Sequence, residues 1–423
     1  TARRRMAMSS PKLVIAAASA VAAASAVAVV FGADAVVGAF SNLLSWRQAS
    51  VGAVPATMTA VVAVDSTCVA KPWPVPTVLA EEEVLIRVAA TAINRLDTMQ
   101  RRGKSPVPNG VTEVLGLEVA GVVVAVGAAA RGFRVGDRVM ALVPGGGYAE
   151  YVSVHTATVM HKPRALSWAQ TGKRLLVAPR GVYLAVSGQK VKIKSGEPPL
   201  YSHSPQAAAA PEAWLTAALN LQLGRAAAGE TVLIHAAASG VGVAAIQLAR
   251  AAGLDVIVTV GSAEKLALAR RLGAAGGAIR HEGPWLATVR ALAPTGVDVI
   301  LDCVGGSYAE ENLEALALDG RWVLYSMLGG PALPPTLAPT FLAQLLRKRV
   351  HLLATTLRTR SVPFKRALVH DFVARALPRL GGDLTIVIDR EFDGLEQAQA
   401  AHAYMESDAN LGKIVLHVTT MAE

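Results

Sequence analysis

A turn of small residues limits the fold of this chain more than any other feature. Thr231–His235 is apolar and β-branched like a buried strand, and Val243–Ala252 has the pattern of an apolar helix. Small residues between them let the backbone approach a pyrophosphate, while the helix N-terminus supplies N–H donors and a positive dipole end. A tight turn without a ligand is the alternative. The residues expected to hold a dinucleotide pyrophosphate are Ser239, Gly240, Val241 and Gly242.

Strands and helices continue to alternate after this turn. Val256–Val260 and Val297–Leu301 are predicted strands, Glu264–Leu272 is a predicted helix, and Trp322–Tyr325 is a further predicted strand. Strands that alternate with helices of this length predict a parallel sheet with helices on both faces. The second half of the chain is therefore expected to be a doubly wound α/β domain.

The first half of the chain has a different pattern. Val84–Val88 and Val119–Val126 are short apolar strands, and Gly136–Val139 and Gly145–Val152 each pass from a glycine turn into another strand. This pattern predicts an all-β segment with glycines at its turns.

The residues after the second strand of the α/β region indicate which dinucleotide binds. An NAD enzyme places an acid here to hold the ribose 2′-hydroxyl, whereas a 2′-phosphate needs cations or hydroxyls. This chain has Ser262 and Lys265 in that place, and Arg280 follows the next strand. We therefore expect NADPH to be preferred over NADH. Ser262 also suits a helix N-cap, and the two roles are compatible.

Further motifs occur in a fixed order along the chain. They are Ala92–Asp97, Leu115–Gly121, Gly136–Val139, Pro211–Ala217, Leu301–Gly306, Leu318–Tyr325, Leu357–Arg360 and Asn410–Leu416. Together with Ala236–Arg250 they resemble the zinc-independent, zeta-crystallin-like quinone oxidoreductases of the medium-chain dehydrogenase/reductase superfamily. The resemblance covers residues 57–170 and 207–418.

This resemblance implies an α/β protein with a GroES-like β-barrel catalytic domain packed on a Rossmann doubly wound parallel sheet. The nicotinamide is expected between the two domains. The expected segments are an N-terminal extension (1–56), the first part of the catalytic domain (57–170), an insertion (171–206), the Rossmann domain (207–356) and the C-terminal part of the catalytic domain (357–423).

The resemblance also implies the chemistry. Asn94–Asp97 stands where zinc-dependent relatives begin with a cysteine ligand, and Gly116–Glu118 lacks their ligating histidine. With two cysteines in the chain, we expect no catalytic zinc. A quinone carbonyl is already electrophilic, so the expected reaction is hydride transfer from NADPH to quinones or related enones.

The resemblance assigns the remaining site residues. Asn94 and Tyr148 are expected at the catalytic centre, with Asn94 near the nicotinamide and substrate, and Asn410 and Lys413 are expected to close over the cofactor. Alternatively, Asn94 and Asp97 only cap a local turn, and Lys413 is a solvated surface charge.

The N-terminal extension contains an uncharged stretch, Leu13–Ala33, preceded by a basic flank. A helix of 21 residues spans about 30 Å, the thickness of a bilayer core. We predict a membrane anchor in a mitochondrial or chloroplast membrane, with the catalytic domains on the side that contains NADPH. A cleaved targeting peptide and a helix packed on a partner protein are the alternatives. A structural role as an accessory subunit of an organellar membrane complex is the alternative to catalysis.

The basic charge of the chain is concentrated in its additions. Of a net charge of +10, residues 1–56 carry +4 and residues 171–206 carry +5. A nucleic-acid-binding protein should spread basic residues over its folded face, so we expect no nucleic-acid partner. The insertion is either a partner-binding loop or an unspliced fragment. We expect contacts with a membrane complex through these two segments, or a homodimer if no such complex forms.

Overall fold

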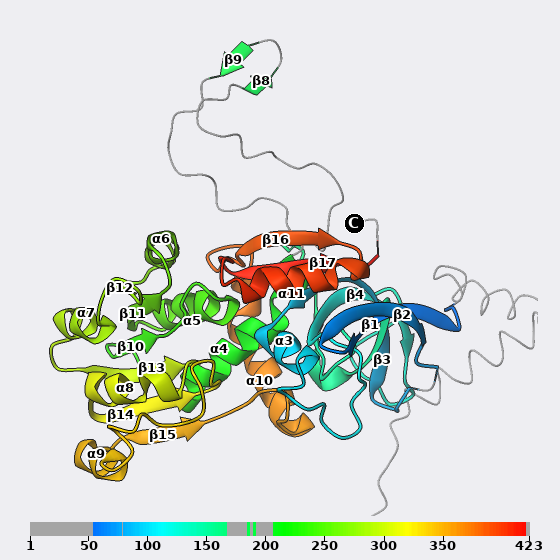
Figure 1. Cartoon of the computed structure of the whole chain (residues 1–423). Coiled ribbons are helices and arrows are strands. Elements are labelled where there is room, and N and C mark those ends of the chain that lie inside the picture. The colour runs from blue at the N-terminus through cyan, green and yellow to red at the C-terminus, as the bar shows by residue number, and fades with distance from the viewer. Residues whose placement is uncertain (1–53, 78, 167–183, 187–188, 192–205, 420–423) are drawn as a thin grey trace, which may run out of the picture. The chain divides into compact units, whose positions relative to one another are not determined.

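The computed structural model describes residues 54–77, 79–166, 184–186, 189–191 and 206–419 (Figure 1). The helix predicted at 13–33 lies outside the described residues. Of the insertion, the structure describes Gln206 and two short strands, β8 (Leu184–Val186) and β9 (Gln189–Val191), which pair with each other. Among the helices of the described residues, none combines the length and apolar character that a bilayer crossing requires.

Six parallel strands form the sheet predicted for the second half of the chain. They are β10 (Thr231–Ile234), β11 (Asp255–Val260), β12 (Gly276–Ile279), β13 (Val297–Asp302), β14 (Leu316–Leu324) and β15 (His351–Ala354). Their order is β12-β11-β10-β13-β14-β15, with every neighbouring pair parallel. The strand order reverses between β10 and β13, because β11 and β12 extend the sheet on one side of β10 and β13, β14 and β15 extend it on the other. In such sheets ligands bind at the carboxyl ends of the strands beside that reversal.

Helices cover both faces of this sheet, because alternate residues of each strand point to opposite sides. Val232 packs in one core with helices α4 (Pro211–Leu223) and α5 (Gly240–Ala251). Leu233, the next residue, packs in a second core with α7 (Trp285–Leu292) and α8 (Ala309–Ala315). The helix α6 (Ala263–Arg271) follows β11, and α9 (Phe341–Lys348) precedes β15. The doubly wound α/β prediction is confirmed.

A second, largely antiparallel sheet contains the strands predicted in the first half of the chain. Its strands are β3 (Glu83–Ile93), β4 (Glu118–Val126), β5 (Arg138–Leu142), β6 (Tyr151–His155), β7 (Val159–His161), β16 (Ile388–Asp393) and β17 (Lys413–His417). The C-terminal strand β17 lies beside β3, with Ile414 opposite Ile93. A hairpin of β1 (Thr57–Val64) and β2 (Thr67–Pro74) pairs separately. The helices associated with this part are α3 (Arg95–Arg101), α10 (Val362–Arg375) and α11 (Ala398–Glu406).

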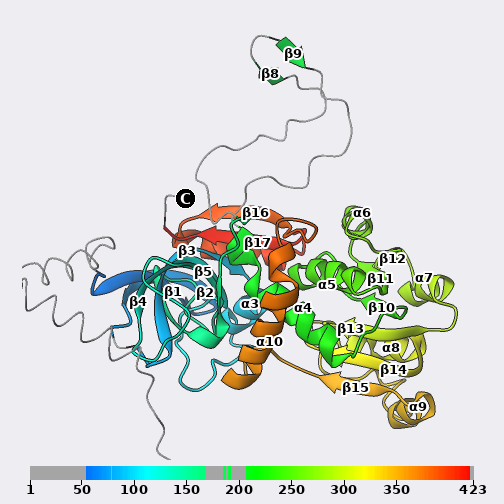
Figure 2. The same cartoon turned by 180° about the vertical axis from the view of Figure 1, so that it is seen from behind.

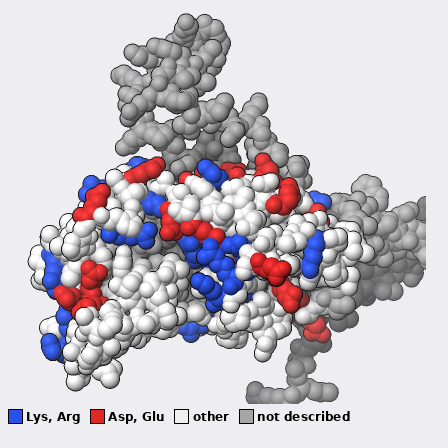
Figure 3. Space-filling view, in the orientation of Figure 1, with Lys and Arg blue, Asp and Glu red and all other residues white. Residues whose placement is uncertain are grey.

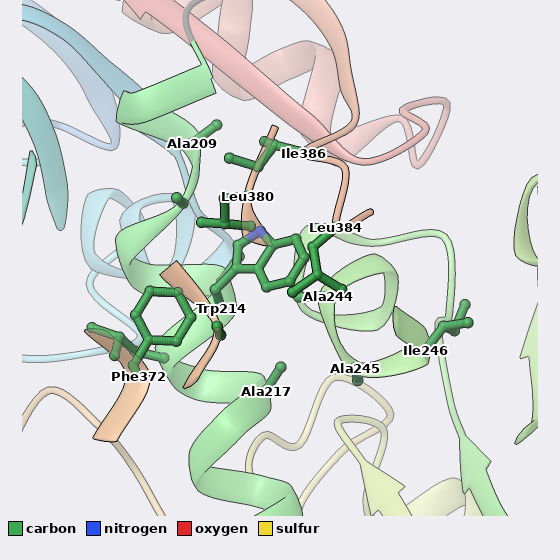
Figure 4. Packing of buried hydrophobic residues seen from close by; sticks show 14 of the residues in the cluster. Ala209, Trp214, Ala217, Ala244, Ala245, Ile246, Phe372, Leu380, Leu384 and Ile386 are labelled. Atoms are coloured by element: carbon green, nitrogen blue, oxygen red, sulfur yellow. The ribbon is translucent and has the colours of Figure 1, made fainter. Parts of the chain in front are cut away.

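The two sheets share a core around Trp214. Helices α4 and α10 lie between the sheets in both views (Figures 1 and 2). Trp214 of α4 is 1% exposed and packs with Phe372 of α10, Ala244 of α5 and Leu384 (Figure 4). The same core includes Ala90, Ala120 and Met140 from the antiparallel sheet. This shared core fixes the antiparallel sheet against the start of α5, and the polar residues described next lie at that junction.

Candidate active site

The turn at the start of α5 has the geometry that the sequence predicts. Ser239 caps the helix, because its Oγ accepts a hydrogen bond from the N–H of Gly242 at 3.1 Å. A Cβ on Gly242 would lie 2.5 Å from Cα of Ala237, so only glycine fits the approach of helix to strand. The first turn of a helix leaves N–H groups without helical acceptors, which suits an anion. The turn therefore fits a pyrophosphate.

The segment before β17 lies directly against this turn. The N–H of Gly412 donates to the carbonyl of Ala238 at 2.7 Å, and Nδ2 of Asn410 donates to the carbonyl of Gly412 at 2.9 Å. A Cβ on Gly240 would collide with Cδ of Lys413, so the aliphatic part of Lys413 passes over the first residue of α5. The structure thus brings Asn410 and Lys413 to the predicted nucleotide turn, and their contact with a cofactor stays a prediction.

Three cations converge on Asp408 beyond the end of β11. Nη2 of Arg95 lies 2.6 Å from Oδ1 of Asp408, and Nη2 of Arg280 lies 3.7 Å from Oδ2. Nζ of Lys265 donates to the backbone carbonyl of Asp408. Burial lowers the pKa of Lys265, which Asp408 opposes and Arg280 reinforces. Ser262 caps α6 by accepting from the N–H of Lys265 at 3.3 Å.

The surface shows a related pattern. In the middle of the face drawn in Figure 3, Lys and Arg side chains gather where Figure 1 places α3, with Asp and Glu beside them. The three predicted 2′-phosphate residues, Ser262, Lys265 and Arg280, therefore lie in one place. Arg95 joins them from the antiparallel sheet's side of the junction, which the sequence alone did not indicate.

A buried ion pair lies at the centre of the junction. Nζ of Lys413 is 2.7 Å from Oε1 of Glu118, and the two side chains are 6% and 0% exposed. The same Nζ donates to Oδ1 of Asn94 at 2.6 Å and to the carbonyl of Ile93 at 2.9 Å. Nδ2 of Asn94 donates to Oε1 of Glu118 at 2.9 Å. Lys413 is therefore not a solvated surface charge, and the amide of Asn94 is held in one orientation by both charges.

A chain of buried hydrogen bonds leads away from Asn94. Oδ2 of Asp97 accepts from the N–H of Asn94 at 2.8 Å and from the hydroxyl of Tyr148 at 3.1 Å. The Tyr148 oxygen is 3.1 Å from Nε2 of His402, whose Nδ1 is 3.6 Å from Sγ of Cys68. Since Tyr148 donates to Asp97, His402 donates through Nε2 and accepts from the thiol. The alternative role of Asn94 and Asp97 as a local cap is also present, because Asn94 is the N-cap of α3 and Asp97 in its first turn accepts from the N–H of Asn94.

Burial sets the protonation of this chain. It raises the pKa of Asp97 to about 7, against the hydrogen bonds from Asn94 and Tyr148, and lowers that of His402 to about 4. Burial also raises the pKa of the Tyr148 hydroxyl well above its ordinary value. Tyr148 is 0% exposed, so in this structure it reaches the site through Asp97, and its catalytic role stays a prediction.

Two more charged groups approach the same place. The N–H of Glu212, in the first turn of α4, donates to Oε2 of Glu118 at 2.9 Å. Burial raises the pKa of the Glu212 carboxyl to about 8, and the negative charge of Glu118 acts in the same direction. Arg358 is 8% exposed and its Nε donates to the carbonyl of Pro144 at 2.7 Å. Both effects favour the protonated form of the Glu212 carboxyl beside these cations.

Three residues at this site, Arg95, Glu212 and Arg358, were not predicted as site residues from the sequence, and Glu118 was predicted no role. A signal was present for one pair, because Glu118 and Lys413 are single charges that each directly precede an apolar run, and a buried charge at such a position is rare unless it is paired. Within the described residues, no cluster of three or more histidine, cysteine or carboxylate side chains is arranged to hold a metal ion.

Comparison with known proteins places this geometry in a family. Residues 80–164 match the "Alcohol dehydrogenase GroES-like domain", and residues 240–373 match "Zinc-binding dehydrogenase". A quinone oxidoreductase of Pseudomonas aeruginosa is 30% identical over 337 residues, which are 79% of this chain and 90% of the relative. The chain belongs to the quinone oxidoreductase family. The family predicted from the sequence is thereby confirmed, and with it the assignment as an oxidoreductase of the medium-chain dehydrogenase/reductase superfamily.

Other relatives and solved structures agree with this placement. Prostaglandin reductase-3 of Bos taurus is 29% identical over 360 residues, 82% of this chain and 83% of the relative. The quinone oxidoreductase structure from Coxiella burnetii has a TM-score of 0.64 at 26% identity and covers 86% of this chain and all of its own. A mycobacterial structure complexed with NADPH has a TM-score of 0.66 at 26% identity, covering 85% of this chain and 99% of its own. The GroES-like and Rossmann arrangement is confirmed by these matches.

Proposed function

We propose that this oxidoreductase uses NADPH to reduce quinones or related enones and needs no catalytic zinc. Relatives named as quinone oxidoreductases and as a prostaglandin reductase support this substrate class. NADPH supplies a hydride when it is bound, and a conjugated carbonyl accepts it without a Lewis acid. The residues of this chain then have three tasks: to hold the cofactor, to orient the substrate, and to control a proton.

The group of cations around Asp408 is the observation that carries the choice of cofactor. The guanidinium groups of Arg95 and Arg280 face the Asp408 carboxylate, and Lys265 bonds to the backbone carbonyl of the same residue. Asp389 is a second carboxylate that acts on Lys265, so the three cations outnumber the two carboxylates beside them. A phosphate monoester carries close to two negative charges at neutral pH, whereas a ribose 2′-hydroxyl carries none. The acid that would hold that hydroxyl is absent from the tip of β11, where Gly261 and Ser262 follow the strand. These residues fit a 2′-phosphate.

The proposal gives the buried ion pair an orienting task. Lys413 contacts the nucleotide turn through its stem at Gly240 and holds Asn94 through its amine. Because the same side chain touches both sites, the position of the Asn94 amide depends on the position of the turn. Asn94 is therefore proposed to orient the substrate beside the cofactor. Oδ1 of Asn94 and Oε1 of Glu118 are both bound by the Lys413 amine, so the cation at this position in the proposal is Lys413 and not a metal ion.

Cofactor oxidation with several acceptors tests the proposal. NADPH or NADH is mixed with a benzoquinone, a naphthoquinone, an enone and a simple aldehyde, each with and without a metal chelator. We expect turnover with quinone or enone, preference for NADPH, and no loss with the chelator. Turnover with the aldehyde alone, or activity that disappears with the chelator and returns with zinc, would contradict the proposal.

For localisation we propose that residues 13–33 anchor the enzyme in an organelle membrane. The support is the length and apolar character of that stretch, together with its basic flank. A membrane complex as partner and the insertion 171–206 as its contact remain part of this proposal. Fractionation of the native organelle tests this localisation.

A further inference from the structure

Arg358 is a buried cation whose charged end has no partner among the described residues. The side chain is 8% exposed, and its Nη1 and Nη2 atoms meet no acceptor in the part of the chain that the structure describes. A guanidinium carries five N–H donors, and buried donors without acceptors are strongly unfavourable. Such a group is rare in a native protein and points to a ligand that supplies the acceptor.

The rest of the residue is firmly fixed. Nε donates to the carbonyl of Pro144 at 2.7 Å, and the backbone carbonyl of Arg358 accepts from Nζ of Lys365 at 2.7 Å. The first contact orients the guanidinium plane, and the second holds the loop after β15 against α10. The two Nη atoms are therefore held in place, as a rigid binding group requires.

The guanidinium lies beside the site already described. Burial lowers the pKa of Arg358, and the charges of Asp97 and Glu212 act in the opposite direction without cancelling that effect. Neither carboxyl forms an ion pair with Arg358 among the described residues, and Oδ1 of Asp97 is itself without a partner there. Asp97 directs its other oxygen to Asn94 and Tyr148. The Arg358 guanidinium thus feels the charges of these two carboxyls without forming an ion pair with either.

We propose that Arg358 binds the carbonyl oxygen of the substrate and stabilises the negative charge that this oxygen gains during reduction. The inference rests on the proposed function and names the group that recognises its substrate class. A planar guanidinium can donate two parallel hydrogen bonds to one acceptor, and such bonds strengthen when the acceptor becomes an anion.

Reduction of the substrate places a negative charge on its carbonyl oxygen. A C–H bond forms when the hydride reaches the conjugated carbon of the substrate, and the π electrons move toward the carbonyl carbon. The C=O bond becomes a C–O single bond whose oxygen carries the negative charge. Arg358 holds that oxygen. For an enone, a proton from water then adds to the α carbon and the C=O bond re-forms, which gives the saturated ketone. For a quinone, the oxygen takes a proton from water, and the ring carbon that received the hydride loses a proton while the second carbonyl oxygen gains one, which gives the hydroquinone. Donors aimed at this oxygen bind it more strongly in the transition state than in the ground state and so raise kcat.

A phenol that cannot be reduced tests this role without turnover. 4-Nitrophenol is titrated into the enzyme loaded with NADP⁺, and the phenolate absorbance gives its pKa when bound. In the wild type we expect the phenolate to bind about tenfold more tightly than the phenol, a shift of one pKa unit. R358Q should lose this preference, whereas R358K should retain part of it. Equal preference in the wild type and R358Q would overturn the inference.

Arg360 provides a matched control on the same loop. Its Nη2 donates to Oγ1 of Thr355 at 2.7 Å, and its guanidinium lies 4.7 Å from the Phe364 ring centroid, so its contacts are satisfied within the protein. R360Q removes the same charge and should leave phenolate binding and kcat close to wild type. R358Q should lower kcat on the order of 10²-fold while the Kd for NADPH is unchanged. A parallel loss of NADPH affinity would assign Arg358 to the cofactor instead.

Thermal unfolding separates this role from a structural one. R358M loses the bond from Nε to the Pro144 carbonyl, but it also removes a buried charge whose Nη atoms have no acceptor among the described residues, so its melting temperature should stay close to that of the wild type. A large fall in the melting temperature would mean that Arg358 is structural and would overturn the inference. If no quinone or enone is reduced at all, the proposed function fails, and the phenolate titration still decides whether Arg358 binds an oxyanion.

Discussion

The pair Lys413–Glu118 gives the most direct test of how the junction is held. K413M removes the cation and leaves the Glu118 carboxylate 0% exposed without its charge partner. Glu118 would keep the hydrogen bonds from Asn94 and from the N–H of Glu212. Breaking a buried ion pair by removing one member costs about 3–5 kcal/mol, because the other charge remains buried. For a protein of this size, that corresponds to a fall in Tm of about 5 °C.

A double-mutant cycle separates the pair from its surroundings. E118Q should also destabilise, since Lys413 then keeps only Oδ1 of Asn94 and the carbonyl of Ile93. K413M/E118Q removes both charges, so its cost should be lower than the sum of the single costs by about 2 kcal/mol or more. Urea unfolding, followed by circular dichroism, measures each variant.

The control is an exposed pair, Arg290–Glu314, whose side chains are 54% and 43% exposed at a separation of 2.7 Å. R290M should cost less than about 1 kcal/mol, because water screens that pair. High salt should weaken the control effect and leave the Lys413 effect nearly unchanged. Additive costs in the cycle, or a Lys413 effect that salt abolishes, would refute the reasoning.

Three further predictions follow from the charges of the site and from the sequence. K265A should weaken NADPH binding about tenfold or more and leave the affinity for NADH unchanged, whereas D408N should strengthen NADPH binding. Fluorescence titration measures both affinities, and equal effects on the two cofactors would count against the 2′-phosphate site. The pKa of Glu212 is raised to about 8, so the folded state keeps a proton that the unfolded state loses near pH 4.5. As pH rises from about 4.5 to 8, the free energy of unfolding should therefore fall by up to about 1.4 kcal/mol per pH unit. E212Q should remove that part of the slope and leave the part due to Asp97, which unfolding at several pH values measures. Carbonate extraction should leave the full-length protein in the membrane fraction if residues 13–33 are an anchor, whereas a soluble protein or a mature N-terminus beyond Ala33 would contradict it.

Local sequence patterns were enough to predict the α/β half of the molecule. The turn Ala236–Gly242 is surrounded by an apolar strand and helix, and both form close to their expected bounds, as β10 and α5. Glycines and small residues act there through local backbone geometry, which a sequence shows directly. The Ser262 cap of α6 is local in the same way, because its partner is three residues away.

The charged centre of the site could not be predicted in this way, because its members are far apart in the chain. Lys413 and Glu118 are separated by 295 residues, and Glu212 meets Glu118 across 94. A sequence shows that a lone charge in an apolar strand needs a partner, but the sheet order selects that partner. Here β17 lies next to β3 and β3 next to β4, which brings Lys413 to Glu118 and Asn94. Arg358 was not identified as a site residue for a related reason, since only the fold reveals which donors remain unsatisfied.

Sheet order also joins the two halves of the site through one segment. Between Asp408 and Lys413 the chain contacts the cations near β11, the turn before α5 and the Glu118 carboxylate. A cofactor held by the turn and the cations should therefore stabilise this segment together with β17. Amide exchange measures that coupling, because the N–H of Gly412 bonds to Ala238 and that of Lys413 to the carbonyl of Val387 at 2.9 Å.

NADPH at 100 times its Kd stabilises the bound form by about 2.7 kcal/mol. If these two amides exchange only when the cofactor is released, we expect their exchange to slow about 100-fold. The outer strand of the hairpin, β2, serves as the internal control, since among the described strands it pairs with β1 alone, whereas β1 also bonds to Tyr148 and Leu115. The amides of β2 should open locally without releasing the cofactor. Uniform protection of the hairpin and the segment would show that the cofactor stabilises the fold as a whole. Unchanged exchange at Gly412 and Lys413 would show that the segment opens without disturbing bound NADPH, and the link between Lys413 and the nucleotide turn would then be incorrect.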